Sequence, residues 1–337
     1  MRREMLMNWN EKRKETAAGE TSRIRLLAVV GPTASGKSAL AVELAKRLGG
    51  EIVSCDSMQV YRRMNIGTAK PTEAERRGIL HHLIDVADPN EAFSCADYVS
   101  MAKQTVEEIV SRGAVPILCG GTGLYLDSFL RGGFAETKVD PAVRERLLTF
   151  AREHGNAALH RRLAEVDPES AESIHENNVK RVVRAFEIYE STGMTKTEAD
   201  RRSREEESPY DATVIGLRYS NREVLYARIN RRVEQMLDAG LLDETRALRA
   251  EGVFAANNTA AQAIGYKELL AYLDGEQTLD GAIEDLKTAT RRYAKRQMTW
   301  FGAKPYVKWI DVERDGTVRP IGELLDEATA IWRGDRG

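Results

Sequence analysis

The sequence has only three cysteines, and they stand far apart along its 337 residues. Cys55, Cys95 and Cys119 match no metal-ligand spacing, and so few thiols exclude a scaffold that depends on disulfides. We therefore expect free, buried thiols and a reducing, cytoplasmic location.

Long apolar runs are also missing. No stretch approaches the roughly 18–20 apolar residues of a membrane span, so we expect no membrane partner. The first 23 residues carry mixed charges and lack the apolar centre of a signal peptide, and we interpret 1–23 as a flexible N-terminal extension. A hydrophobic content of 42% is ordinary for a soluble globular protein, and the length suffices for about two domains.

Signature motifs of several protein classes are absent as well. The chain has no N-K-x-D guanine signature, which argues against a GTPase. No long apolar strand ends in the Asp-Glu pair of a motor ATPase, and nothing resembles a Ser-His-Asp triad.

One segment that is present matches the phosphate-binding pattern G-x-x-x-x-G-K-[ST] at every fixed position. It follows an apolar run, 24–30, that predicts a buried strand, and it precedes a helical pattern at 39–48. Backbone N–H groups and the helix N-terminus form an anion nest, Lys37 adds a charge, and the Ser38 hydroxyl can hold Mg²⁺. We expect a di- or triphosphate to bind Gly31, Pro32, Thr33, Ala34, Ser35, Gly36, Lys37 and Ser38.

Strand-like and helical runs alternate along the chain. Strand patterns occur at 25–30, 51–55, 80–86, 115–119 and 213–217, with helical patterns such as 98–112 between most of them. This alternation predicts an α/β fold of the P-loop NTPase-like type, a parallel sheet flanked by helices. Binding sites in such sheets gather at the carboxyl ends of the strands, where the segments 31–38, 56–59 and 120–123 fall.

Between about 137 and 209 the strand signals stop and the charge density rises. Helix starts are indicated at Asp140-Pro141 and at Asp167-Pro168. Amphipathic helices follow the next strand at 222–239 and 241–251, and a terminal helix is indicated near 321–332. We predict a P-loop-type catalytic core made of 24–136 and 210–337, and an all-helical insertion domain at 137–209.

Two side chains at the expected strand ends can carry chemistry. A carboxylate at Asp56 can hold Mg²⁺, orient a substrate or accept a proton, and the alternative is a simple turn cap. The hydroxyl of Thr122, in a glycine-rich turn, can donate to a phosphate oxygen, and the alternative is an ordinary strand-end turn. We expect the acceptor of a transfer reaction to lie opposite the phosphate, near Asp56.

Positive charge concentrates in helical segments. Arg228 and Arg232 are four residues apart, and they either clamp an anion or belong to an exposed, salt-bridged face. The segment from 287 to 308 contains seven Lys or Arg and no acidic residue. If it is helical, the basic residues from Lys287 to Arg296 cover one half of the helix surface. This half either contacts a phosphate backbone, through residues such as Arg292, or is a solvated face.

Taken together, nine strings resemble the bacterial tRNA dimethylallyltransferase (tRNA isopentenyltransferase) family over about 26–309. They are GPTASGKS (31–38), DSMQVYRRMNIGTAKPT (56–72), HHLID (81–85), FSCADY (93–98), GGTGLY (120–125), RVVRAFEIYESTG (181–193), RINRRVEQML (228–237), QAIGYKE (262–268) and RRYAKRQMTWF (291–301).

The resemblance implies transfer of the dimethylallyl group of dimethylallyl diphosphate to the exocyclic amine of the adenosine beside the tRNA anticodon. It implies that Asp56 is the proton acceptor for that amine and that Thr122 contacts the diphosphate near the breaking bond. The implied partners are the anticodon stem-loop of tRNA and dimethylallyl diphosphate, and we expect a monomer with Mg²⁺ as cofactor. Eukaryotic relatives carry a C-terminal zinc finger, but no cysteine follows Cys119, so we predict no zinc.

The resemblance also implies a set of tRNA-contacting residues. Ser57, Met58 and Gln59, beside Asp56 and Thr122, would line the path of an extruded base. The other positions expected to contact tRNA, including three from the basic segment, are Arg144, Lys180, Arg181, Val182, Val183, Arg184, Gln262, Ala263, Ile264, Gly265, Tyr266, Lys267, Arg291, Arg292 and Lys295.

Two other functions remain open from the sequence. A small-molecule kinase with Asp56 as base for a hydroxyl acceptor explains the phosphate loop, but it does not explain the basic segment or the large insertion. A nucleotide-gated RNA-binding module would explain the basic residues without any catalysis.

Overall fold

The structure, a computed structural model, describes residues 23–131, 140–205, 207–256 and 258–334. The extension expected at 1–23 lies outside the described residues, except for Arg23. The chain divides into two compact units, one ending at Leu130 and resuming at Tyr210, and the other spanning 131–209. We call these the core unit and the helical unit, and each is described by itself.

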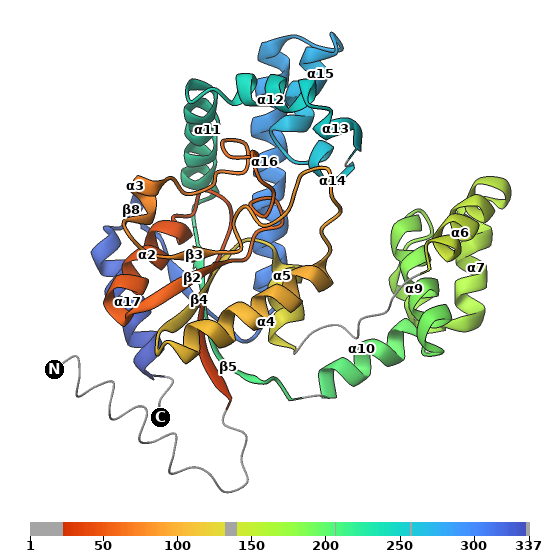
Figure 1. Cartoon of the computed structure of the whole chain (residues 1–337), viewed down its shortest axis with the longest axis horizontal. Coiled ribbons are helices and arrows are strands. Elements are labelled where there is room, and N and C mark those ends of the chain that lie inside the picture. The colour runs from red at the N-terminus through yellow and green to blue at the C-terminus, as the bar shows by residue number, and fades with distance from the viewer. Residues whose placement is uncertain (1–22, 132–139, 206, 257, 335–337) are drawn as a thin grey trace, which may run out of the picture. The chain divides into compact units, whose positions relative to one another are not determined.

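The core unit is built on a six-stranded sheet in the order β3-β2-β4-β1-β5-β6, and every neighbouring pair runs parallel. The predicted parallel α/β fold is therefore confirmed (Figure 1). The strands are β1 (Ile24–Val30), β2 (Gly50–Ser54), β3 (His81–His82), β4 (Val115–Gly120), β5 (Tyr210–Arg218) and β6 (Val307–Asp311).

One strand prediction needs correction, and one strand was not predicted. The strand expected at 80–86 pairs with β2 only through His81 and His82, because Leu83 and Asp85 adopt positive φ values that break an extended strand. The end of the basic segment is also not helical. It forms the edge strand β6, whose Val307 and Ile310 are buried against the sheet while Lys308 is exposed.

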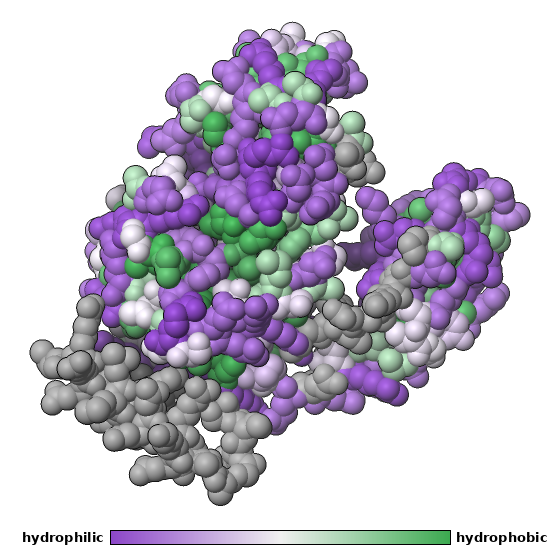
Figure 2. Space-filling view, in the orientation of Figure 1, coloured by the Kyte–Doolittle hydropathy of each residue, from purple (hydrophilic) through white to green (hydrophobic). Residues whose placement is uncertain are grey.

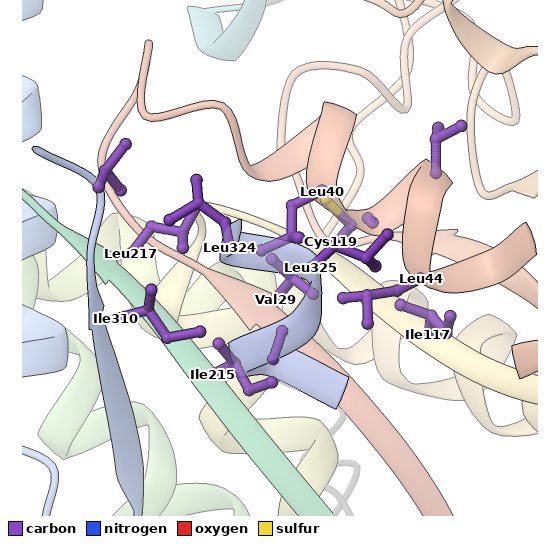
Figure 3. Packing of buried hydrophobic residues seen from close by; sticks show 14 of the residues in the cluster. Val29, Leu40, Leu44, Ile117, Cys119, Ile215, Leu217, Ile310, Leu324 and Leu325 are labelled. Atoms are coloured by element: carbon purple, nitrogen blue, oxygen red, sulfur yellow. The ribbon is translucent and has the colours of Figure 1, made fainter. Parts of the chain in front are cut away.

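Alternate residues of the strands face opposite sides of the sheet, and each side is covered by helices. Val29, Ile117 and Ile215 pack with Leu40 of α2 (Lys37–Leu48) and with Leu324 of α17 (Ile321–Gly334), as Figure 3 shows. Their neighbours Ala28, Leu118 and Val214 face the other cluster, which contains the buried hydrophobic side chains of α4 (Cys95–Ser111) and α5 (Gly123–Leu130).

A third hydrophobic cluster joins the loop after β2 to the C-terminal helices. Val60, Tyr61 and Met64 of that loop are fully buried together with Leu241 and Tyr266. In Figure 1 most of these helices gather at one end of the core unit, and the longest of them runs from that end toward α5. They are α11 (Arg222–Asp238), α12 (Leu241–Ala250), α13 (Val253–Ala256), α14 (Asn258–Ala261), α15 (Tyr266–Leu273) and α16 (Leu279–Gly302).

Short elements complete the core unit. A capping box at Thr72 begins α3 (Glu73–Arg76), and an antiparallel pair, β7 (Glu313–Arg314) and β8 (Thr317–Val318), precedes α17. No helix in the described part of the chain is long and apolar enough to cross a membrane. Hydrophilic residues cover most of the face of this unit that Figure 2 shows, with a hydrophobic area between the C-terminal helices and α4.

The helical unit has its own hydrophobic core, in which Leu159, Val182 and Phe186 are buried. Two of its helices, α6 and α8, begin where the sequence predicts, because Asp140 and Asp167 accept hydrogen bonds from the backbone N–H groups of Ala142 and Ser170 in their first turns. The helices are α6 (Pro141–His154), α7 (Asn156–Val166), α8 (Pro168–Ser173), α9 (Val179–Thr192) and α10 (Lys196–Glu205).

Candidate active site

The phosphate loop connects β1 to α2 and places the N-terminus of that helix at the edge of the sheet. Gly36 caps the helix with φ of 93°, a conformation that a residue with a Cβ adopts only under strain. At Gly31 an added Cβ would lie 2.8 Å from the carbonyl oxygen of Leu217, so the loop passes too close to β5 for a side chain. The loop is thus shaped to present backbone N–H groups to an anion.

Positive side chains converge on this loop. Burial lowers the pKa of Lys37, and neighbouring Arg232 lowers it further, while Cys119 and Asp56 act in the opposite direction. Burial also lowers the pKa of Arg232. Arg228 donates a hydrogen bond from Nε to the carbonyl oxygen of Ala34 at 3.1 Å. Both arginines are only partly accessible, which favours the anion clamp over the exposed face as the interpretation.

Asp56 lies two residues beyond the end of β2 and is half-buried. Its Oδ1 accepts hydrogen bonds from the backbone N–H groups of Met58 at 2.9 Å and Gln59 at 3.3 Å. The turn cap that the sequence left open is therefore present. The same carboxylate interacts electrostatically with Lys37 and Arg232, so it faces the phosphate loop as well. Both hydrogen bonds use Oδ1, and within the described residues no hydrogen bond reaches Oδ2.

Thr122 follows β4 and connects the ends of two strands. Its hydroxyl oxygen accepts a hydrogen bond from the backbone N–H of Ser57 at 3.0 Å, and its own N–H donates to the carbonyl oxygen of Cys55 at 3.2 Å. The phenol of Tyr293 on α16 lies close to both Thr122 and Asp56. Burial raises the pKa of Tyr293, and Asp56 raises it further, whereas the contact with Thr122 lowers it.

Gln297 on α16 connects the phosphate loop to the turn after β4, a link that the sequence analysis missed. Its Oε1 accepts from the backbone N–H of Thr33 at 2.8 Å, and its Nε2 donates to the carbonyl oxygen of Gly121 at 3.0 Å. An added Cβ at Gly121 would lie 2.0 Å from that Nε2 atom. The only sequence signal was the position of Gln297 between the buried residues Ala294 and Phe301 of a helix with an otherwise charged face.

The residues expected to line the path of a base are half-buried beside Asp56. Gln59 is fixed by its side chain, since Nε2 donates to the carbonyl oxygens of Thr68 at 3.3 Å and Ala69 at 3.2 Å. Its Oε1 accepts from the Ser54 hydroxyl at 3.0 Å. The Ser57 hydroxyl accepts a long hydrogen bond from the Thr122 hydroxyl at 3.4 Å.

In the core unit, the positions expected to contact tRNA differ in how exposed their side chains are. Gln262 and Lys267 are exposed, Ile264 is half-buried, and the side chains of Ala263 and Tyr266 belong to the core, as does Gly265. On α16, Arg291 is half-buried and donates to the Asn230 side chain at 2.8 Å. The side chains of Arg292 and Lys295 are exposed.

In the helical unit, too, some of these positions are exposed and others are buried. Arg144 and Arg184 both form ion pairs with Glu187, at 2.6 and 3.2 Å, and the Glu187 side chain is fully buried. Lys180 and Arg181 are exposed at the start of α9, while Val182 and Val183 lie in the hydrophobic core. A role for the two valines would therefore be to hold the helix that carries the exposed residues.

Comparison with known proteins agrees with this arrangement. The model of the family described as IPP transferase matches residues 59–304, which is most of the chain. The chain belongs to this IPP transferase family. The predicted family is thereby confirmed.

Relatives of this IPP transferase family member carry consistent names. A tRNA dimethylallyltransferase of Halalkalibacterium halodurans is 50% identical over 289 residues, covering 86% of this chain and 91% of the relative. One from Caldanaerobacter subterraneus subsp. tengcongensis is 45% identical over 309 residues, covering 91% and 98%.

Solved structures lead to the same family. The full-length tRNA isopentenylpyrophosphate transferase of Bacillus halodurans aligns with a TM-score of 0.67 at 45% identity, covering 93% of this chain and 98% of that one. A eukaryotic dimethylallyltransferase acting on tRNA aligns with a TM-score of 0.73 at 31% identity, covering 86% of this chain and 74% of that one.

Proposed function

We propose that the chain is a tRNA dimethylallyltransferase. It transfers the dimethylallyl group of dimethylallyl diphosphate to the exocyclic amine of the adenosine adjacent to the tRNA anticodon. The observation that carries this proposal is the convergence of the phosphate loop, Asp56 and Thr122 at one edge of the sheet, in a chain of this family. The names of the chain's relatives do not favour the alternative function, a small-molecule kinase.

The bonds that form and break in this reaction require groups that accept a proton and stabilise negative charge, and residues of both kinds lie at this edge of the sheet. A bond forms between the amine nitrogen and the allylic carbon while the bond from that carbon to the diphosphate oxygen breaks. The electron pair leaves on the diphosphate, and its charge would be stabilised by Lys37, Arg228, Arg232 and the loop N–H groups. The amine proton passes to the Asp56 carboxylate.

Asp56 and Thr122 act on opposite sides of the forming bond in this proposal. Hydrogen bonds to Oδ1 fix the Asp56 carboxylate, so that Oδ2 can receive the proton without a change of rotamer. The Thr122 hydroxyl accepts a hydrogen bond from the Ser57 backbone and donates a long one, at 3.4 Å, to the Ser57 hydroxyl, and in this proposal its proton turns to a diphosphate oxygen instead. Holding amine and allylic carbon in line contributes up to about 7–11 kcal/mol to such a reaction.

We also propose Mg²⁺ as a cofactor that enters with the diphosphate. The described residues contain no cluster of three His, Cys, Asp or Glu that could hold a metal by themselves. Ser38, exposed in the first turn of α2, would supply a hydroxyl ligand, and the diphosphate would supply the remaining charged oxygens. Bound there, the ion would neutralise part of the leaving-group charge.

For tRNA, the exposed residues of the two units are the proposed contacts. In the core unit these are Arg292 and Lys295, together with Gln262 and Lys267, and in the helical unit Lys180 and Arg181. Their side chains can reach phosphates without breaking the ion pairs that hold Arg144 and Arg184. Because one chain supplies every group named for the chemistry, we expect it to act as a monomer.

Two labelled substrates separate this function from a kinase. The purified chain is incubated with unmodified tRNA and either carbon-labelled dimethylallyl diphosphate or ATP labelled at the γ-phosphate. We expect label from the allylic diphosphate to enter tRNA, with no consumption of ATP. Transfer of the γ-phosphate to any acceptor, without prenylation, would refute the proposal.

A further inference from the structure

Glu244, in the first turn of α12, directs its carboxylate at the loop that follows Asp56. Oε2 accepts hydrogen bonds from the backbone N–H groups of Asn65 at 3.0 Å and Ile66 at 2.9 Å. Oε1 accepts from those of Ile66 at 3.0 Å and Gly67 at 3.1 Å. Three successive N–H groups that converge on one carboxylate form an anion nest of the kind that the backbone otherwise offers to phosphates.

Tyr266 of α15 completes this contact. Its hydroxyl donates to Oε1 of Glu244 at 2.6 Å, and its ring is fully buried. Burial raises the pKa of Tyr266, and the Glu244 carboxylate raises it further, so the phenol remains a donor. An added Cβ at Gly67 would lie 2.5 Å from the ring, which shows how tightly the loop is seated. Figure 1 shows α12 and α15 at the same end of the core unit.

Hydrogen bonds lead from this loop back to Asp56. The residues directly after the Glu244 contact, Thr68 and Ala69, offer their carbonyl oxygens to Nε2 of Gln59. The backbone N–H of Gln59 in turn donates to Oδ1 of Asp56 at 3.3 Å. The path from Glu244 to Asp56 is therefore continuous through backbone and side-chain hydrogen bonds.

A second contact holds the far end of the same loop. The Lys70 ammonium pairs with the Asp85 carboxylate at 2.5 Å and also donates to Asn65 Oδ1 at 3.1 Å. The loop is thus fixed on both sides of Thr68 and Ala69. Since Lys70 follows those residues and Glu244 holds the three before them, their carbonyl oxygens stay directed at Gln59.

We propose that Glu244 is a positioning residue for the transfer reaction, acting through the loop 65–69 and Gln59 on the orientation of the Asp56 carboxylate. This inference rests on the proposed function, in which Asp56 accepts the amine proton. Glu244 touches no element of the phosphate loop in the hydrogen bonds described above, so its loss acts on turnover rather than on diphosphate binding.

The kinetic test compares Glu244→Gln with the wild type. A glutamine replaces one acceptor oxygen by an NH₂ group that faces backbone donors, so at least part of the nest is lost. We expect kcat to fall about 10- to 100-fold, the effect of a misplacement of about 1 Å. The KM for dimethylallyl diphosphate and the binding stoichiometry of inorganic diphosphate should stay near the wild-type values. Glu244→Asp, which keeps the charge, should recover part of kcat.

Asp243→Asn is the matched control, because Asp243 is the preceding residue of α12 and its exposed carboxylate pairs only with Arg246 among the described residues. It should leave kcat unchanged. Loss of diphosphate binding in step with kcat would indicate general unfolding of the Glu244→Gln variant and would overturn the proposal, as would an unchanged kcat.

Hydrogen exchange gives a readout that does not depend on transferase activity. The amides of 65–67 should exchange faster in Glu244→Gln than in the wild type, and Asp243→Asn should match the wild type. Unchanged exchange in Glu244→Gln would show that Glu244 does not fix the loop. A wild type without transferase activity would refute the proposed function, and the exchange result would still decide whether Glu244 holds the loop.

Discussion

The hydroxyl oxygen of Thr122 accepts a hydrogen bond from the backbone N–H of Ser57 across 3.0 Å. This bond joins the turn after β4 to the turn after β2, and so holds the two proposed catalytic side chains at the edge of the sheet. Because Ser57 directly follows Asp56, a displacement of Thr122 would also displace the carboxylate. The two residues therefore form one unit, fixed by the pairing of neighbouring parallel strands.

Asp56→Asn should abolish turnover while leaving tRNA affinity nearly unchanged. Asparagine keeps an oxygen that can accept from the N–H groups of Met58 and Gln59, but it cannot accept the amine proton. The measurement is single-turnover transfer together with a tRNA binding titration. Asp56→Ala removes the turn cap as well, so a larger loss of stability is expected for alanine. A normal kcat in Asp56→Asn would rule out the carboxylate as proton acceptor.

The affinity for diphosphate should depend on pH through Lys37. Burial lowers the pKa of this side chain in the ligand-free protein, and a bound diphosphate stabilises the ammonium and raises the pKa again. Binding therefore takes up a proton, and affinity should fall as the pH rises from the lowered pKa toward the ordinary lysine value of about 10.4.

Calorimetry of inorganic diphosphate binding across this pH range checks the prediction. Lys37→Met should bind weakly and lose the pH dependence. Lys46→Met, at an exposed position in the last turn of the same helix, should behave as the wild type. If Lys37→Met retained the wild-type pH dependence, another group would be responsible.

Arg292→Gln combined with Lys295→Gln should weaken tRNA binding and flatten its salt dependence. Both side chains are exposed on α16, whereas Arg291 is engaged with Asn230. Each lost phosphate contact should reduce the slope of log K against log salt by about one. Arg246→Gln, an exposed arginine on α12, is the control. The interpretation of this face would be wrong if only the diphosphate KM changed.

Gln297→Ala should lower the free energy of unfolding. It leaves the Thr33 N–H and the Gly121 carbonyl without their side-chain partner, which costs about 1–3 kcal/mol for each buried group left unsatisfied. Urea denaturation measures the loss. Thr299→Ala, at an exposed position of the same helix, should change stability by less than about 0.5 kcal/mol. Equal stabilities of the two variants would show that the Gln297 bridge contributes nothing.

The comparison of sequence with structure shows which features local patterns can reveal. The alternation of apolar strands and helices predicted the parallel sheet, and the loop at Gly31 predicted the edge of that sheet at which a phosphate binds. The glutamine bridge escaped notice because Gln297 and Thr33 are 264 residues apart, a distance at which periodicity carries no information. Glu244 escaped for a related reason: an acidic residue in the first turn of a helix is common, and only the fold brings a backbone nest to it.

The charge patterns predicted where basic residues concentrate, but not which of them are exposed. Within the basic segment 287–308, Arg291 is half-buried, Arg292 is exposed and Lys308 lies on the edge strand β6. These differences in environment come from the packing of the fold and not from the charge pattern. Likewise, Val182 and Tyr266 lie within strings shared with the family, yet their side chains belong to hydrophobic clusters. A shared string does not separate residues that touch a substrate from those that hold the touching residues in place.

The most direct test of the central claim is nucleoside analysis after incubation with labelled dimethylallyl diphosphate. The substrate is an unmodified anticodon stem-loop, and the control is the same stem-loop with a purine ribonucleoside lacking the exocyclic amine at the target adenosine. We predict label in one prenylated adenosine, one diphosphate released per label, and no label in the control. Label in the control RNA, or no label in either RNA, would contradict the account.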